Sequence, residues 1–137
     1  MESVDKYLKE ALKEAQKAYK KKEVPVGAVI IKEDKIIARA HNLRETRNNA
    51  LAHAEIICIN KACKKLGTWR LEGCKMYITL APCQMCMGAI KQARINEVYI
   101  GALDDKNNEP LEENVKHIES TECSEILTRF FKELRNK

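Results

Sequence analysis

Residues 75–93, KMYITLAPCQMCMGAIKQA, combine the pattern of a strand with that of a following helix. Lys75–Leu80 is a short, mostly apolar run, and Pro82 interrupts the chain just after it. From about Cys83 to Ala93 the pattern is that of a helix. The stretch therefore predicts a strand, a tight connection and a helix, which are the components of an α/β fold.

The rest of the chain alternates helices and strands in a similar way. An amphipathic helix is predicted ahead of Pro25, because apolar residues recur there at helical spacing. Val26–Ile31 and Ile36–Ala40 are predicted strands, and the short polar turn between them indicates an antiparallel pair. The other predicted elements are a helix over His53–Leu66, strands over Glu97–Ile100 and Val115–Glu119, and a closing helix over Ser124–Leu134. The inward face of the closing helix is expected to carry Ile126, Leu127, Phe130, Phe131 and Leu134. This order predicts an α/β layered fold with a mixed sheet.

Length and composition are those of an ordinary globular protein. The 137 residues, 45% apolar and 33% charged, indicate one domain over 1–137. No apolar run approaches the roughly 20 residues that cross a bilayer, and the first residues lack the apolar stretch of a secretory signal. We therefore expect a cytoplasmic protein without a membrane partner, in which the six cysteines bind metal or fill the core. A net charge of +5 is compatible with a polyanionic partner and equally with none.

Two short motifs carry the candidate chemistry, His53-Ala54-Glu55 and Pro82-Cys83-Gln84-Met85-Cys86. One imidazole and two thiolates form a three-ligand set for zinc, and the open fourth position is typical of a catalytic site with one ion per chain. The spacing of Cys83 and Cys86 lets both sulfurs reach one ion from a single helical turn. The amino end of that helix also favours thiolate over thiol.

Glu55 is the predicted catalytic residue, because it lies two positions from a ligand without being one. Zinc in such a site activates water near neutral pH. A hydrolytic reaction at such a site needs a proton taken from water, one delivered to the substrate and one delivered to the leaving group. A single carboxylate beside the metal can serve all three transfers.

The cysteines also allow two plainer interpretations, a redox pair and a structural zinc site. A redox pair would explain neither His53 nor Glu55. A structural zinc site would need a fourth ligand, and the candidates are Cys58, Cys63, Cys74 and Cys123. Buried thiols among aliphatic neighbours more often fill a core. The two motifs together favour a catalytic zinc site that acts on a nucleobase.

Beyond these motifs, the chain resembles the cytidine deaminase superfamily and, within it, the bacterial tRNA adenosine deaminases. The resemblance extends over almost the whole chain, at residues 24–29, 42, 66–72, 79–89, 94–95, 101–104 and 130–135. It implies a three-layer α-β-α sandwich with a five-stranded mixed sheet, and a homodimer. It also implies conversion of adenosine to inosine at the wobble position of the tRNA anticodon loop.

The same resemblance implies a set of substrate contacts. Asn42 would hydrogen-bond the base, Val26 and Leu80 would line its pocket, and Phe130 or Phe131 would approach a flipped-out nucleotide. The complete set of expected substrate-binding residues is Asn42, Val26, Ala54, Leu80, Asp104 and Phe131. On the residues alone, the preferred interpretation of Asn42 is a turn residue that ends a strand. Packing under the last helix explains Phe130 and Phe131 equally well.

Three departures from the tRNA enzymes leave the substrate open. Asn49-Ala50-Leu51 replaces the usual Asp-Pro-Thr, Ala81 replaces a glutamate, and residues 107–113 replace a glycine- and serine-containing loop. Glutamates in that last segment oppose phosphate binding. The alternative is a small-molecule deaminase acting on free cytosine, guanine or a nucleoside, and the stretch His41–Arg44 also resembles such enzymes. A non-catalytic zinc-stabilised subunit is the other alternative, which the presence of Glu55 disfavours.

Overall fold

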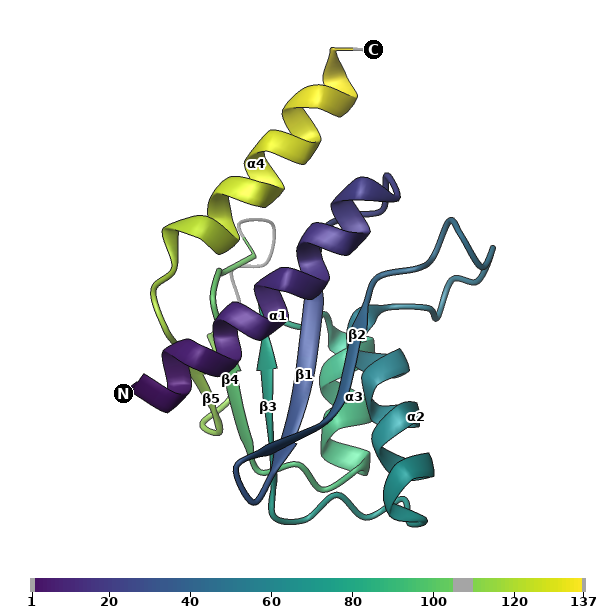
Figure 1. Ribbon diagram of the computed structural model, residues 1–137, viewed down its shortest axis with the longest axis vertical. Helices are drawn as coiled ribbons and strands as arrows, with labels where there is room; N and C mark the ends of the chain where they lie inside the picture. Colours follow the sequence, from purple (N-terminus) through teal and green to yellow (C-terminus); the bar gives the residue numbers. More distant parts are fainter. Residues whose placement is uncertain (1, 105–109, 137) are drawn as a thin grey trace.

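The computed structural model describes residues 2–104 and 110–136, which form a five-stranded sheet with helices on both faces (Figure 1). The elements are α1 (Glu2–Lys20), β1 (Gly27–Lys32), β2 (Lys35–His41), α2 (Ala54–Leu66), β3 (Cys74–Ile78), α3 (Gln84–Gln92), β4 (Glu97–Ile100), β5 (Val115–His117) and α4 (Thr121–Arg135). The strand order is β2-β1-β3-β4-β5. β1 is antiparallel to both of its neighbours, whereas β3, β4 and β5 run parallel. The predicted mixed sheet and antiparallel hairpin are confirmed.

Three layers result, because α2 and α3 cover one face of the sheet while α1 and α4 lie on the other (Figure 1). Side chains that alternate along β1 serve two cores. Ile30 packs with Met76 and Ile90 beneath α2 and α3, whereas Val29 packs with Tyr77 beneath α1. A strand buried on both faces carries a nearly continuous apolar run, which explains the uniform hydrophobicity of β1.

The start of β1 lies directly against α1. A Cβ atom placed on Gly27 would lie 2.0 Å from the carbonyl oxygen of Ala11 and 2.5 Å from the amide nitrogen of Ala15. Only glycine fits this approach. The close packing fixes the segment before β1, residues 24–26, at the end of the sheet where α2 and α3 begin.

The closing helix corrects one expectation. Ile126 is buried, and Leu127 and Phe130 are half-buried, as an inward face requires. Phe131 and Leu134, however, are 36% and 57% exposed. The reason is that α4 packs on α1 while its last turns project past the sheet (Figure 1), so the sheet does not cover the end of its apolar stripe.

Two further expectations concern the segment 107–113 and membrane-spanning helices. Of the segment 107–113, residues 107–109 lie outside the described residues, and Pro110–Glu113 are exposed. Among the helices described, none has the length and apolar character needed to span a membrane.

Candidate metal centre and adjoining pocket

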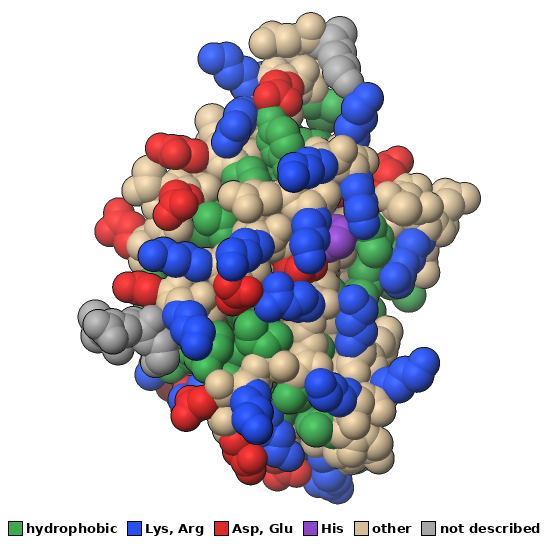
Figure 2. All heavy atoms as spheres, in the orientation of Figure 1, with side chains coloured by type: hydrophobic (Ala, Val, Ile, Leu, Met, Phe, Trp, Pro, Cys, Tyr) green, Lys and Arg blue, Asp and Glu red, His purple; other side chains and the backbone are tan. Residues whose placement is uncertain are grey.

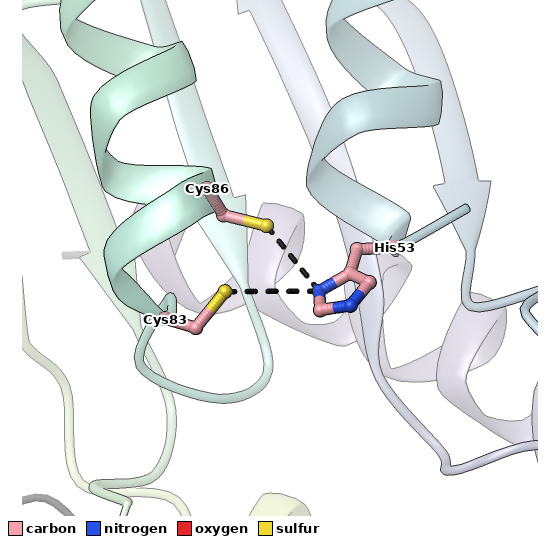
Figure 3. A group of neighbouring side chains, drawn as sticks. All are labelled: His53, Cys83 and Cys86. Atoms are coloured by element: carbon pink, nitrogen blue, oxygen red, sulfur yellow. Dashed lines mark hydrogen bonds between the residues drawn. The ribbon is translucent and has the colours of Figure 1, made fainter. Parts of the chain in front are cut away.

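The side chains of His53, Cys83 and Cys86 converge from the beginnings of two helices (Figure 3). His53 immediately precedes α2, Cys83 immediately precedes α3, and Cys86 lies in the first turn of α3. His53 and Cys83 have extended backbone, and neither side chain caps its own helix. The imidazole Nδ1 lies 3.8 Å from the Cys83 sulfur and 3.5 Å from the Cys86 sulfur. All three donor atoms lie within 4.8 Å of one another, so one ion can contact them together.

The chemistry of this donor set fits zinc. One imidazole nitrogen and two sulfurs form a borderline-soft set that favours zinc over hard cations. Burial and the nearby Arg44 lower the pKa of His53, which keeps the imidazole in the neutral form that binds metals. Burial raises the pKa of the Cys86 thiol, and a cation beside the sulfur would act in the opposite direction.

The four other cysteines do not join this cluster. In the described part of the chain, the grouping of His53, Cys83 and Cys86 is the one set of three or more donors able to share an ion. Cys58 instead packs under β1, its sulfur 3.7 Å from the carbonyl oxygen of Ala28. The structural-zinc alternative therefore lacks a fourth protein ligand among the described residues.

Glu55 lies in the first turn of α2, beside the cluster, and is 4% exposed. Burial raises the pKa of its carboxyl group to about 7, although hydrogen bonds with its own backbone N–H and with Cys86 act to lower it. A carboxyl group poised near neutrality can both accept and donate a proton. The position of the Glu55 carboxyl group and its pKa of about 7 are those of a general acid–base.

A cavity of about 140 Å³ adjoins the cluster. Its lining comprises Val24, Val26, Asn42, Arg44, His53, Ala54, Glu55, Leu80, Ala81, Cys83 and Asp104. Five of the six expected substrate-binding residues are therefore in the lining. The sixth, Phe131, borders a neighbouring groove of about 650 Å³ that shares Leu80 and Asp104 with the cavity.

Asn42 presents an unpaired polar atom at this cavity. It is 6% exposed, directly follows β2, and donates from Nδ2 to the carbonyl oxygen of Val24 at 3.4 Å. Its Oδ1 lacks a hydrogen-bond partner, which is true of no other buried side-chain nitrogen or oxygen in the described residues. An orphaned buried acceptor costs about 1–3 kcal/mol, so a donor supplied by a bound molecule would be favoured here.

Three residues of the lining were absent from the expected set. In the sequence, Ala81 is distinguished only as a departure from the tRNA enzymes, and Val24 only as part of the stretch 24–29. Arg44 was named only as the end of the stretch His41–Arg44, and it is one of several cations in a polar loop. Its place beside His53 depends on how the loop between β2 and α2 folds.

Comparison with known proteins gives one family match and a set of close relatives. The family model of the MafB19-like deaminases matches residues 2–135. The tRNA-specific adenosine deaminase of Bacillus subtilis is 49% identical, covering 96% of this chain and 90% of the relative. The enzyme of the same description from Aquifex aeolicus is 46% identical, with 95% of each chain covered.

Solved structures include two informative neighbours. One comes from a study of A-to-I editing by tRNA deaminases at the wobble position of transfer RNA, with 38% identity and a TM-score of 0.77 over 83% of this chain and 98% of that one. The other is a guanine deaminase from Bacillus subtilis, with 35% identity and a TM-score of 0.70 over 97% of this chain and 94% of that one. Both have the fold described above.

Proposed function

This chain belongs to the MafB19-like deaminases, and from that premise we propose that it hydrolytically deaminates adenosine to inosine at the wobble position of tRNA. The observation that carries the proposal is the meeting of three features at one small cavity. These are a set of metal-binding donors, a buried carboxyl group with a raised pKa, and an unpaired amide oxygen. Hydrolytic deamination needs an activated water, a proton carrier and a group that orients the base.

We propose that His53, Cys83 and Cys86 hold one zinc ion per chain. When bound, zinc in such a site supplies Lewis-acid activation of water near neutral pH. The start of α2 and the start of α3 both point at the cluster, and their partial positive charge favours the thiolate form of the cysteines.

Glu55 moves the protons. It accepts one from the attacking water and delivers protons to the ring nitrogen and to the leaving amine. Water supplies the oxygen that forms the new carbonyl bond at C6, and the broken carbon–nitrogen bond releases ammonia. Because Glu55 is buried, bulk water does not compete for these protons.

The remaining lining orients the base. Asn42 accepts a hydrogen bond through its unpaired Oδ1, while Val26 and Leu80 contact the ring. Ala54 leaves room beside the metal ligands, and Asp104 stands at the junction with the groove that Phe131 borders. A cavity of about 140 Å³ has room for a base but not for a stacked strand, so the nucleotide must be flipped in.

The partners follow from this substrate. Figure 2 shows Lys and Arg side chains spread over the face that carries α1 and β2, which suits a polyanion. We further propose a homodimer, supported by the exposed apolar side chains of Leu51, Met85 and Leu111. A cytoplasmic location and a single domain over 1–137 are part of the same proposal.

A single-turnover assay tests the substrate. Zinc-loaded protein is mixed with unmodified tRNA that has adenosine at the wobble position, and inosine is read by sequencing. The matched control is Glu55→Gln, which keeps the size of the side chain and removes its acid–base function. Inosine confined to the wobble position supports the proposal. No inosine, from protein that contains about one zinc per chain, contradicts it.

A guanine deaminase is the second candidate, because the solved guanine deaminase is 35% identical over nearly the whole chain. Ala81 lines the cavity where the tRNA enzymes usually carry a glutamate. The same protein preparation is therefore assayed with free guanine and cytosine. A higher kcat/KM for a free base than for tRNA would transfer the assignment to that base.

A further inference from the structure

Glu23 is a buried carboxylate outside the metal cluster whose bonds all go to one loop. Its side chain is 1% exposed. One oxygen accepts a hydrogen bond from the backbone N–H of Glu45 at 3.1 Å. The other accepts from the backbone N–H of Thr46 at 2.6 Å and from its hydroxyl at 2.7 Å. A carboxylate is buried at little cost only when it is bonded in this way, so Glu23 and the loop are held together.

The electrostatics agree with the geometry. Burial alone would raise the pKa of Glu23, but the hydrogen bonds from Thr46 and Glu45 outweigh burial and the pKa is lowered. The carboxylate therefore keeps its charge and its full capacity to accept. The charged form is the one that binds two adjacent amides most strongly.

These bonds join two segments of the chain that both contribute to the cavity lining. On one side, Glu23 directly precedes Val24, which lines the cavity together with Val26. On the other side, Glu45 directly follows Arg44, which also lines it. Glu23 is not itself in the lining, so it acts behind the wall and not on the substrate.

The loop depends on such anchoring. Residues 44–51 are all exposed and contribute no side chain to a core, and Asn48 has a φ of 49° in the left-handed region. The loop nevertheless connects Asn42 to His53. A shift in the loop would therefore displace Arg44, which lines the cavity beside His53.

We infer that Glu23 is a positioning residue for the deamination, holding Arg44 and the loop that follows Asn42 against the segment that carries Val24 and Val26. The inference rests on the proposed function. Because Glu23 contacts neither the cluster nor the cavity, it acts on substrate binding and not on zinc or on proton transfer. A change that weakens binding of the substrate and of the transition state equally raises KM and leaves kcat unchanged.

The first test is a kinetic series at the anchor. Glu23→Ala removes all three bonds and is expected to raise KM for the tRNA by roughly 10- to 100-fold, with kcat and zinc content close to those of the wild type. Glu23→Gln keeps one oxygen that can accept and is expected to restore part of the loss. Thr46→Val removes the hydroxyl bond alone and is expected to have the smallest effect. A kcat loss equal to the KM change, or loss of zinc, would overturn the inference.

The second test separates positioning from stability. Leu8→Ala truncates a buried residue in the core beneath α1, so it lowers the melting temperature without touching the loop. At a temperature where both variants are folded, Leu8→Ala is expected to keep the wild-type KM while Glu23→Ala does not. Equal KM values for Leu8→Ala and Glu23→Ala would show that Glu23 affects stability alone, which would contradict the inference.

A readout that needs no substrate distinguishes failure of the inference from failure of the proposed function. In Glu23→Ala, the amides of Glu45 and Thr46 are expected to exchange hydrogen faster than in Leu8→Ala. If the wild type deaminates guanine instead of tRNA, the same KM comparison is made on guanine. Unchanged exchange at both amides overturns the anchor whichever substrate the enzyme uses.

Discussion

Two buried glutamates, Glu55 at the metal cluster and Glu14 between α1 and β2, are nearly equally hidden from solvent but differ in pKa. Glu55 is 4% exposed, and burial raises its pKa to about 7. Glu14 is 2% exposed, and although burial opposes ionisation, hydrogen bonds from Lys17 and His41 lower its pKa. For Glu14 the hydrogen bonds outweigh the effect of burial on the pKa, whereas for Glu55 they do not. Uncompensated burial thus supports the proposal that the reaction takes place at the cluster.

The same contrast holds for two adjacent residues, His41 and Asn42. His41 gives Glu14 a hydrogen bond from Nδ1 at 2.9 Å, and Lys21 lies 2.9 Å from the Nε2 atom of the same ring. One residue further along the chain, Asn42 leaves its Oδ1 without a partner. Adjacent residues therefore belong to a satisfied structural network and to a site prepared for a ligand.

The largest expected effect comes from removing a metal-binding donor. Cys86→Ala should lose zinc and all measurable deamination, because two donors hold zinc far less tightly than three. It should also lower the free energy of unfolding by about 3 kcal/mol when free zinc stands a hundredfold above the wild-type Kd. Metal analysis and thermal unfolding with and without a chelator measure both. Unchanged zinc content would remove Cys86 from the ligand set.

Removing the uncompensated carboxyl group is next in size. Glu55→Gln should retain zinc and fold but lower kcat by at least about a hundredfold, because no other buried carboxyl group in the described lining can replace it. Single-turnover rates at equal zinc loading provide the measurement. A variant with substantial remaining activity would assign proton transfer to another group.

The unpaired amide should matter less than the carboxyl group. Asn42→Ala is expected to lower kcat/KM by roughly 10- to 100-fold, as loss of a hydrogen bond made only with the substrate implies. The same change should have only a small effect on the free energy of unfolding, because Oδ1 has no hydrogen-bond partner and the bond that is lost, from Nδ2 to the carbonyl oxygen of Val24, is long at 3.4 Å. A large loss of stability with normal kcat/KM would show that Asn42 is the turn residue it resembles.

Glu14 tests the compensated side of the comparison. Glu14→Gln should cost about 1–3 kcal/mol of unfolding free energy at pH 7 and leave the KM unchanged. Its pKa is lowered in the folded state, so the stabilisation is present above the ordinary value of 4.5 and disappears as pH falls below it. Denaturant unfolding at several pH values should show wild type and variant converging in acid. A difference independent of pH would assign the effect to packing.

The proximity of the three donors could be predicted from the sequence because they stand at helix starts, where spacing determines direction. His-Ala-Glu before one helix and Cys-x-x-Cys at another leave little freedom once the two helices pack side by side. The substrate contacts at Asn42, Val26 and Leu80 came from family resemblance, since the residues alone indicated a turn and core packing.

Two features could not have been predicted from residue patterns. The apolar stripe of α4 indicated an inward face, yet amphipathicity does not show whether a neighbour extends far enough to cover Phe131 and Leu134. Glu23 was missed because a carboxylate bonded to backbone amides of a distant loop has no spacing or composition that marks it. Such contacts depend on tertiary structure alone.

The most direct test of the account is deamination of wobble-adenosine tRNA in ¹⁸O-labelled water, followed by mass analysis of the digested nucleosides and assay of ammonia. Hydrolysis at C6 predicts inosine with one ¹⁸O atom and one ammonia released per inosine formed, both abolished in Glu55→Gln. Inosine without the label, or ammonia released from a free base while the tRNA stays unchanged, would contradict it.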